Sequence, residues 1–225
     1  MSGAVALVSG GLDSVTLAHL LAREGHRPLH LVAIDYGQRH VRELECARRC
    51  AERLDARVDV VDLRSLRPLL GGSALTDDSV PVPDGHYADS SMRLTVVPNR
   101  NAVMLAIAYA AAVAGGAEVV ATAVHAGDHP IYPDCRPQFI DAFRHMENLA
   151  TEGYCRADIL RAPFSAMTKT DIVRLGSSLA VPFADTWSCY RGGRLHCGRC
   201  GTCVERREAF RDAPLDDPTE YETAA

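Results

Sequence analysis

The residues with the clearest chemical potential form a short polar loop near the N-terminus. The pattern SGGxDS stands between a short apolar run, typical of a buried strand, and a stretch with helical apolar spacing. Gly10 and Gly11 allow a ligand to approach the backbone closely, and a helix N-terminus supplies free N–H groups with a partial positive charge. The loop amides, Ser9 and Ser14 could therefore surround a phosphate, with Asp13 or Ser14 capping the helix. An ordinary capped turn is the alternative.

A second group is a cluster of cysteines near the C-terminus. Cys189, Cys197, Cys200 and Cys203 follow the spacing Cys-x7-Cys-x2-Cys-x2-Cys. The last three can reach one ion, and the first closes a four-sulfur shell. Four thiolates predict one structural Zn²⁺ per chain, with an iron–sulfur cluster as the alternative. His196 could compete as a ligand.

Two cationic residues lie at the start of expected helices, where neither capping nor the helix dipole explains a positive charge. Arg100 opens a stretch expected to be helical, and Lys169 follows the expected helix cap Thr168. A cation in the first turn of a helix is disfavoured unless an anion is near. Both are therefore candidate phosphate ligands, against the alternatives of a surface Arg and a solvent-facing Lys. The polar stretch 125–136 is interpreted as a substrate-recognition loop, with a metal site as the alternative.

Composition narrows the class of protein. The chain has 225 residues, 47% of them hydrophobic, and a net charge of −5, so it has no global basic field for nucleic acid. No apolar run reaches membrane-spanning length, and the first strand leaves no room for a signal peptide. The expectation is a cytoplasmic protein that binds neither membrane nor nucleic acid directly, with reduced thiols.

These groups need elements that position them. Strand-like runs at 29–34, 57–62, 118–124 and 159–162 alternate with helical stretches at 41–54, 102–115, 137–149 and from 168. Such alternation predicts an α/β fold with a Rossmann-like, doubly wound parallel sheet, and ligands at the strand C-terminal ends. We expect an ATP-binding α/β domain at 1–183, a zinc-binding segment at 184–210 and a solvated acidic tail at 211–225. The stretch 66–93 is predicted to be a long loop or lid.

The SGGxDS loop resembles the PP-loop of ATP pyrophosphatases, which split ATP into AMP and pyrophosphate. The motifs DYGQRH at 35–40, YPDCR at 132–136, TWSCY at 186–190 and CxxCxxC follow it in order. Together they resemble the 7-cyano-7-deazaguanine synthases of the queuosine pathway, over almost the whole chain. The segment around Asn99 departs from the commoner form, which has Gly at that position.

The resemblance implies a reaction. The carboxylate of 7-carboxy-7-deazaguanine would be adenylated by ATP with Mg²⁺, and ammonia would convert the acyl-adenylate to an amide. A second ATP would activate the amide, and loss of AMP would leave the nitrile. A homodimer is implied as well. A PP-loop enzyme that adenylates another carboxylate or a tRNA base is the alternative, and a non-catalytic zinc-binding module is a further one.

The resemblance also implies site residues. Nucleotide binding falls on Leu7, Val8, Ser9, Gly10, Gly11, Leu12, Asp13, Ser14, Val15, Thr16 and Leu17. The candidate catalytic residues are Ser9, Asp13, Ser14, Arg39, Arg100 and Lys169, with Asp13 a candidate Mg²⁺ ligand. The candidate substrate-binding residues are Tyr36, Gln38, Tyr132, Asp134, Arg136 and Trp187. Among these, Asp134 would bind the guanine-like edge, and Trp187 or Tyr36 would stack on a ring.

Overall fold

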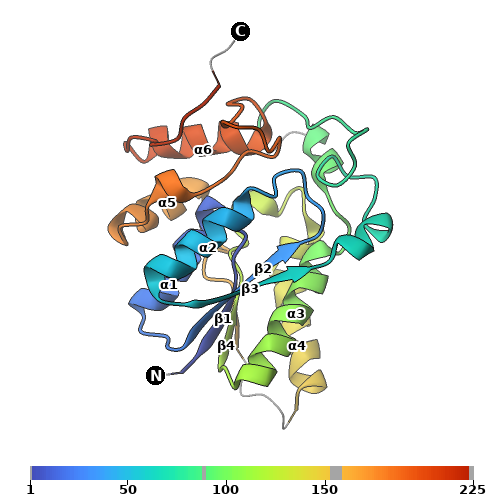
Figure 1. Cartoon of the computed structure of the whole chain (residues 1–225), viewed down its shortest axis with the longest axis vertical. Helices are drawn as coiled ribbons and strands as arrows, with labels where there is room; N and C mark the ends of the chain where they lie inside the picture. The colour runs from blue at the N-terminus through green and yellow to red at the C-terminus, as the bar shows by residue number, and fades with distance from the viewer. Residues whose placement is uncertain (1, 88–89, 153–158, 223–225) are drawn as a thin grey trace.

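The computed structural model describes residues 2–87, 90–152 and 159–222. These residues form a sheet of five parallel strands in the order β3-β2-β1-β4-β5 (Figure 1). The strands are β1 (Ala4–Leu7), β2 (Leu29–Asp35), β3 (Arg57–Asp62), β4 (Val119–Ala121) and β5 (Ile159–Arg161). The expected α/β fold with a doubly wound parallel sheet is confirmed.

The strand order reverses between β1 and β4, which are neighbours in the sheet but distant in the sequence. Ala6 lies opposite Ala121 in the register of these two strands. The loops that leave their C-terminal ends therefore start side by side. In open α/β sheets this reversal is the place where ligands bind.

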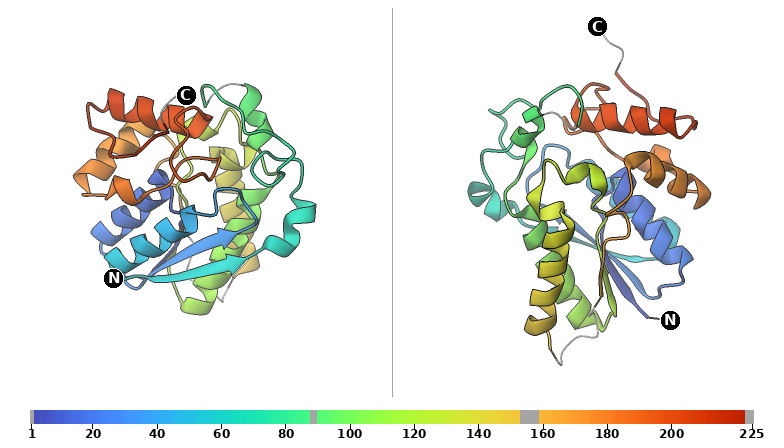
Figure 2. Two further views of the ribbon diagram at one scale, coloured as in Figure 1. Left: turned by 45° about the horizontal axis from the view of Figure 1, so that its top comes forward. Right: turned by 180° about the vertical axis from the view of Figure 1, so that it is seen from behind.

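Helices cover both faces of the sheet, because alternate residues of each strand point to opposite sides. On one face, α1 (Leu12–Arg23) and α2 (Glu43–Leu54) pack against Ala6 and Leu31. On the other, α3 (Arg100–Gly115) and α4 (Pro137–Ala150) pack against Val32 and Val120. The two helix layers flank the strands in Figure 1, and both are seen from behind in Figure 2.

Two more helices complete the first layer. α5 (Lys169–Ser178) contributes Ile172 and Val173 to the core that α1 builds, and α6 (Gly201–Asp212) contributes Phe210. The cysteine-containing part of the chain therefore shares a core with the α/β part. The expected division at 183/184 does not coincide with a gap in packing.

The stretch 66–93 is irregular as predicted, but its described part is packed rather than free. The short 3₁₀ helix η1 (Arg64–Leu69) overlaps its start, and η2 (Ser90–Thr95) overlaps its end. Leu75 and Met92 are fully buried, and Asp84 forms a β-bridge with Cys200. Residues 88–89 lie outside the described residues. The described part is therefore a loop, as one of the two alternatives predicted, and this burial gives no support to the other alternative, a lid.

The C-terminal stretch differs from the expected solvated tail up to residue 222. Asp217 accepts a 3.2 Å hydrogen bond from the buried Arg206. Tyr221 forms a β-bridge with His196, and its ring lies against that histidine. The prediction missed this because acidic composition does not reveal a buried cation as partner. No helix among the described residues is long and apolar enough to cross a membrane.

Candidate active site

The SGGxDS loop has a backbone that requires glycine at its first glycine position. Gly10 has φ of +97°, and a Cβ there would lie 2.0 Å from the carbonyl oxygen of Glu43. Gly11 is the N-cap of α1, without a side-chain cap, so the expectation that Asp13 or Ser14 caps this helix is wrong. The Ser14 hydroxyl instead accepts a hydrogen bond from the Gly10 amide at 3.2 Å and lies 3.2 Å from the Ser9 hydroxyl.

A cavity of about 230 Å³ opens beside this loop, at the reversal between β1 and β4. Most of the predicted site residues meet there. Those lining the cavity are Leu7, Val8, Ser9, Gly11, Leu12, Asp13, Ser14, Tyr36, Arg100, Tyr132, Lys169 and Trp187. The sequence motifs from distant parts of the chain thus converge on one space.

One side of the cavity is a charged cluster around Lys169, the only lysine of the chain. Its ammonium lies 2.5 Å from Asp13 Oδ2, 3.2 Å from Glu205 Oε2 and 3.1 Å from His125 Nε2. Burial alone would lower the pKa of Lys169, but the attraction of Asp13 and Glu205 outweighs it and raises this pKa. A permanent positive charge therefore stands beside the SGGxDS loop.

The pKa values of the two carboxyl groups near Lys169, Asp13 and Glu205, shift in opposite directions. Burial would raise the pKa of Asp13, but Lys169 and His125 together hold it below its usual value. Burial does raise the pKa of Glu205, against the pull of Lys169 and His125. Asp13 Oδ1 is buried and has no hydrogen-bond partner among the described residues.

The turn after β4 completes the charged cluster. Asp128 accepts hydrogen bonds from the backbone N–H of His125 at 3.0 Å and from the hydroxyl of Tyr87 at 2.9 Å. His125 Nδ1 accepts from the amide of Gly127 at 3.0 Å, which fixes the ring. This part of the predicted recognition loop thus turns its polar groups toward Lys169.

Another part of the cavity wall is aromatic. The guanidinium of Arg100 donates to the hydroxyl of Tyr36 at 3.1 Å and lies over that ring. Burial raises the pKa of Tyr36 to about 12, so it is a neutral phenol. The Tyr132 hydroxyl is 2.6 Å from that of Thr95 and 3.4 Å from that of Tyr190. Arg100 is thus held by rings and remains charged.

Other predicted site residues lie away from the cavity. Arg39 donates to the carbonyl oxygen of Val80 at 2.9 Å and pairs with Asp78 at 3.2 Å. Arg136 is exposed and donates to a backbone carbonyl oxygen. Three more do not line the cavity and belong to helix α1: Val15, Thr16 and Leu17. The position of a residue around its helix and the folding of its loop determine whether its side chain reaches the cavity. A sequence motif alone does not give this information.

The side chains of Asp134 and Gln38 form hydrogen bonds with backbone groups. Asp134 accepts a 2.9 Å hydrogen bond from the amide of Asn101 and so caps α3. Gln38 accepts from the amide of Tyr36 at 2.9 Å and donates to the carbonyl of Ile34 at 3.0 Å. Neither lines the cavity. The guanine-binding role predicted for Asp134 has no support in its position.

The unusual Asn99 has a structural explanation. Its φ is +59°, in the left-handed region, at the residue before α3. Glycine favours this region, and asparagine is among the residues that tolerate it. The replacement of the commoner Gly by Asn at this position therefore preserves the turn that presents Arg100.

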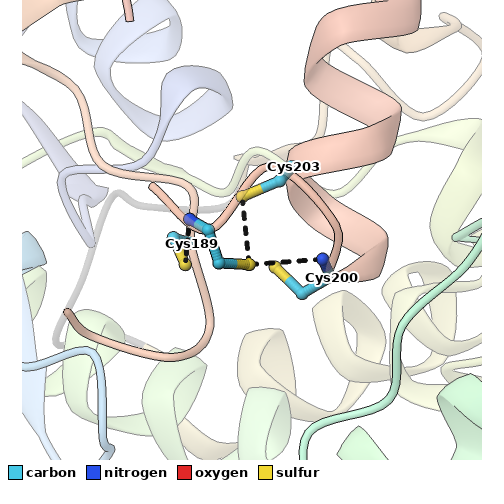
Figure 3. Close-up of side chains that lie close together, drawn as sticks. Cys189, Cys200 and Cys203 are labelled. Carbon is cyan, nitrogen blue, oxygen red and sulfur yellow. Dashed lines mark hydrogen bonds between the residues drawn. The ribbon is translucent and has the colours of Figure 1, made fainter. Parts of the chain in front are cut away.

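The four predicted metal ligands come together in a buried cluster (Figure 3). Their sulfur atoms all lie within 4.8 Å of one another, and the Sγ atoms of Cys197 and Cys203 are 4.0 Å apart. Thiolates around one tetrahedral Zn²⁺ would lie about 3.8 Å apart, given Zn–S bonds of roughly 2.3 Å. The cluster fits a metal ion. His196 is engaged elsewhere, since its Nε2 accepts from the amide of Ser188.

The cysteine cluster also builds the cavity, which sequence reasoning missed. α6 starts beside Cys200 and carries Thr202, Glu205 and Arg206 on one face. Thr202 and Arg206 line the cavity, and Glu205 reaches Lys169. The spacing i, i+3, i+4 of these three residues, which begins between Cys200 and Cys203, was the available signal. Polar and aromatic lining residues outside the predicted set include His40, Glu43, Tyr87, His125, Asp128 and Tyr190.

Comparison with known proteins decides the family. The profile of the family described as "Queuosine biosynthesis protein QueC" matches residues 3–214. The chain belongs to the QueC family. Its members include the "7-cyano-7-deazaguanine synthase" of Rhizobium leguminosarum bv. trifolii, 59% identical over 97% of this chain and 91% of that one. The "7-cyano-7-deazaguanine synthase 1" of Mesorhizobium japonicum is 60% identical over 98% and 94%.

A solved structure shares the fold of this QueC-family chain. It is the NMN synthetase from Francisella tularensis, with a TM-score of 0.51, 14% identity and coverage of 96% of this chain and 78% of that one. At this identity the likeness extends to the fold alone. The curated relatives named above are enzymes by their names, and the chain is an enzyme of this family.

Proposed function

We propose that this protein converts 7-carboxy-7-deazaguanine, ammonia and ATP into 7-cyano-7-deazaguanine, AMP and pyrophosphate. One observation supports it most. In a chain 59% identical to a 7-cyano-7-deazaguanine synthase, the SGGxDS loop, Lys169 and Arg100 converge on one cavity. An anion-binding loop that shares a cavity with two partly buried cations suits a reaction in which pyrophosphate leaves.

The first step is adenylation of the carboxylate. A carboxylate oxygen attacks the α-phosphorus of ATP, the bond to the β-phosphate oxygen breaks, and pyrophosphate leaves on the SGGxDS loop. Lys169 neutralises charge on the phosphates from the side of α5, and Arg100 does so from α3. The unpartnered Asp13 Oδ1 fits a Mg²⁺ ligand, and Mg²⁺ would supply further charge neutralisation to the phosphates.

The second stage builds the nitrile. Ammonia attacks the acyl carbon, AMP leaves with the carboxylate oxygen, and the nitrogen loses a proton to give the amide. The amide oxygen then attacks a second ATP, releasing pyrophosphate. Loss of AMP and of both nitrogen protons forms the carbon–nitrogen triple bond. The overall reaction thus uses two ATP for each nitrile.

Free ammonia is the proposed nitrogen source. Cys135 lines the cavity, but burial raises the pKa of its thiol well above its usual value. Its sulfur accepts a hydrogen bond from the side-chain amide of Asn101 at 3.0 Å. A protonated, buried thiol is a poor nucleophile for releasing ammonia from glutamine.

We propose that the four-cysteine cluster holds a structural Zn²⁺. The sulfur separations suit a single tetrahedral ion, and four protein ligands leave no position for a substrate. Zn²⁺ bound there would fix the turn from which α6 starts. Its presence is tested by elemental analysis of the purified protein, which would show iron and sulfide if a cluster were bound instead.

Product analysis by mass spectrometry tests the reaction. The protein is incubated with ATP, Mg²⁺, an ammonium salt and 7-carboxy-7-deazaguanine, and we expect the nitrile with two AMP per product. AMP without nitrile would favour an adenylating enzyme for another carboxylate or a tRNA base. Lack of AMP in a folded, metal-loaded sample would overturn the proposal.

A further inference from the structure

A carboxyl group beside the aromatic residues of the cavity forms no ion pair with a lysine or arginine among the described residues, although the charge of Arg100 acts on it from farther away. Asp13 and Asp128 lie near Lys169 and His125. Glu43 lines the cavity with a side chain only 9% exposed, and its nearest ionisable partner among the described residues is His40, at 3.5 Å. Burial lowers the pKa of His40 to about 3, so that ring is neutral and forms no ion pair.

Glu43 is held rigidly by one oxygen. Its Oε1 accepts a 3.0 Å hydrogen bond from Gln38 Nε2. The Gln38 amide is itself fixed by the backbone of Ile34 and Tyr36. No donor among residues 2–87, 90–152 and 159–222 bonds to Glu43 Oε2. An acceptor oxygen that is held in place on a cavity wall and receives no protein donor can bind a ligand that brings its own donors.

The surroundings of Glu43 suit a flat ring. Tyr36 and Tyr190 line the same part of the cavity, and the ring of His40 lies 5.4 Å from that of Tyr190. Arg100 packs on Tyr36. Aromatic walls with one fixed polar group are typical of sites for planar heterocycles.

We propose that Glu43 binds the edge of the deazaguanine ring that carries N1–H and the 2-amino group, and thereby selects guanine-type substrates. This inference rests on the proposed function and assigns to Glu43 the part that the sequence assigned to Asp134. The ionised form of Glu43 offers only acceptors, and a guanine-type edge presents two adjacent donors, which would favour the ionised form when the ring is bound. The corresponding adenine edge alternates a donor with an acceptor, which a carboxylate does not match.

The test compares two substrates in two proteins at saturating ATP. The substrates are 7-carboxy-7-deazaguanine and its analogue without the 2-amino group. We expect the unaltered enzyme to prefer the first by about 10- to 100-fold in kcat/KM, because a site built for an N–H rejects the analogue that lacks it. In Glu43→Gln we expect this preference to fall to below about 5-fold, with the KM for ATP unchanged.

Two variants separate the explanations. Glu43→Gln keeps the size of the side chain and an oxygen that can accept from Gln38, so we expect the local structure to be preserved. A general loss of structure would show itself by also raising the KM for ATP. Asp134→Asn tests the competing assignment. Loss of the preference in Asp134→Asn rather than in Glu43→Gln would overturn the proposal, as would a rise in the KM for ATP alone.

The unaltered enzyme provides a measurement that needs no variant. Equal kcat/KM for the two substrates would overturn the inference while leaving the proposed function intact, because nitrile would still form. Absence of nitrile from either substrate would overturn the proposed function itself, and this assignment with it.

Discussion

The backbone N–H of Trp187 donates a 3.0 Å hydrogen bond to the carbonyl oxygen of Gly10. Gly10 belongs to the anion-binding loop, and Trp187 stands two residues before the first cysteine of the metal cluster. The Trp187 indole in turn donates to the carbonyl of Cys189 at 2.8 Å. The two motifs that stand out in the sequence are therefore joined by two hydrogen bonds in the structure.

Gly10→Ala is expected to destabilise the protein and abolish ATP turnover. The new Cβ would meet the Glu43 carbonyl at 2.0 Å, and φ of +97° is strained for alanine. We expect a loss of more than about 2 kcal/mol in the free energy of unfolding. Gly11→Ala is the matched control, because Gly11 has φ of −73° and its Cβ would come no closer than 3.3 Å to the Ser9 hydroxyl and 3.5 Å to the Trp187 carbonyl oxygen. Equal effects in urea unfolding would contradict this account.

Lys169→Met is expected to lower the rate of AMP formation by at least about 100-fold. The variant removes the buried positive charge and leaves Asp13 and Glu205 without their shared partner. Arg174→Met, on the exposed side of the same helix, serves as the control and should retain the rate. AMP release is measured by chromatography. A Lys169→Met protein with unchanged turnover would show that this ammonium does not face the phosphates.

Cys200→Ser is expected to remove the bound metal and weaken ATP binding together. α6 begins beside Cys200 and supplies Glu205 to the charged cluster, so loss of the metal should loosen a wall of the cavity. Cys50→Ser is the control, since Cys50 is a buried core thiol outside the cluster. Metal content by elemental analysis and ATP affinity by calorimetry report the two effects. Full ATP affinity in a metal-free protein would contradict the coupling.

Asn99→Gly is expected to leave stability within about 0.5 kcal/mol, whereas Asn99→Val should lose about 1–2 kcal/mol. The reason is the left-handed backbone at this residue, with φ of +59°. Thermal unfolding compares the two variants directly. Similar melting temperatures for the two variants would mean that the left-handed conformation at residue 99 is not required for stability.

The stability of the protein should fall between about pH 4.5 and pH 8 by an amount that depends on Glu43. Burial raises the pKa of Glu43 to about 8 against the opposing pull of Gln38 and Arg100. The folded state therefore holds this proton more tightly than the unfolded chain does, and stability is lost as pH rises through that window. Glu43→Gln should flatten this part of the profile by a few kcal/mol, measured by urea unfolding at pH 5 and pH 8. An unchanged slope would show that Glu43 is ionised in the folded protein.

The sheet and the chemical motifs were predictable because they depend on local patterns. Alternating apolar runs placed β2 and β3 to within a residue, and Thr168 caps α5 through Asp171 as its sequence suggested. The four cysteines met as their spacing predicted.

The directions of loop side chains were not predictable in the same way. Arg39 and Glu43 are four residues apart, yet only Glu43 lines the cavity. The choice depends on carbonyl groups of residues 77–80, which bind Arg39, and on Gln38, which binds Glu43. Glu205 reaches the site only because α6 packs on α5. Such partners are distant in the sequence, so no local pattern encodes them.

The side-chain ammonium of Lys169 can be followed by NMR spectroscopy. Because this is the only lysine of the chain, a protein grown with ¹⁵N-labelled lysine contains a single labelled side-chain ammonium. That group is enclosed by Asp13, Glu205 and His125, which should slow exchange of its protons with water enough to give a resolved signal. Nucleotide binding would exchange carboxylate neighbours for phosphate oxygens, and one resonance would follow it without any added dye or substitution.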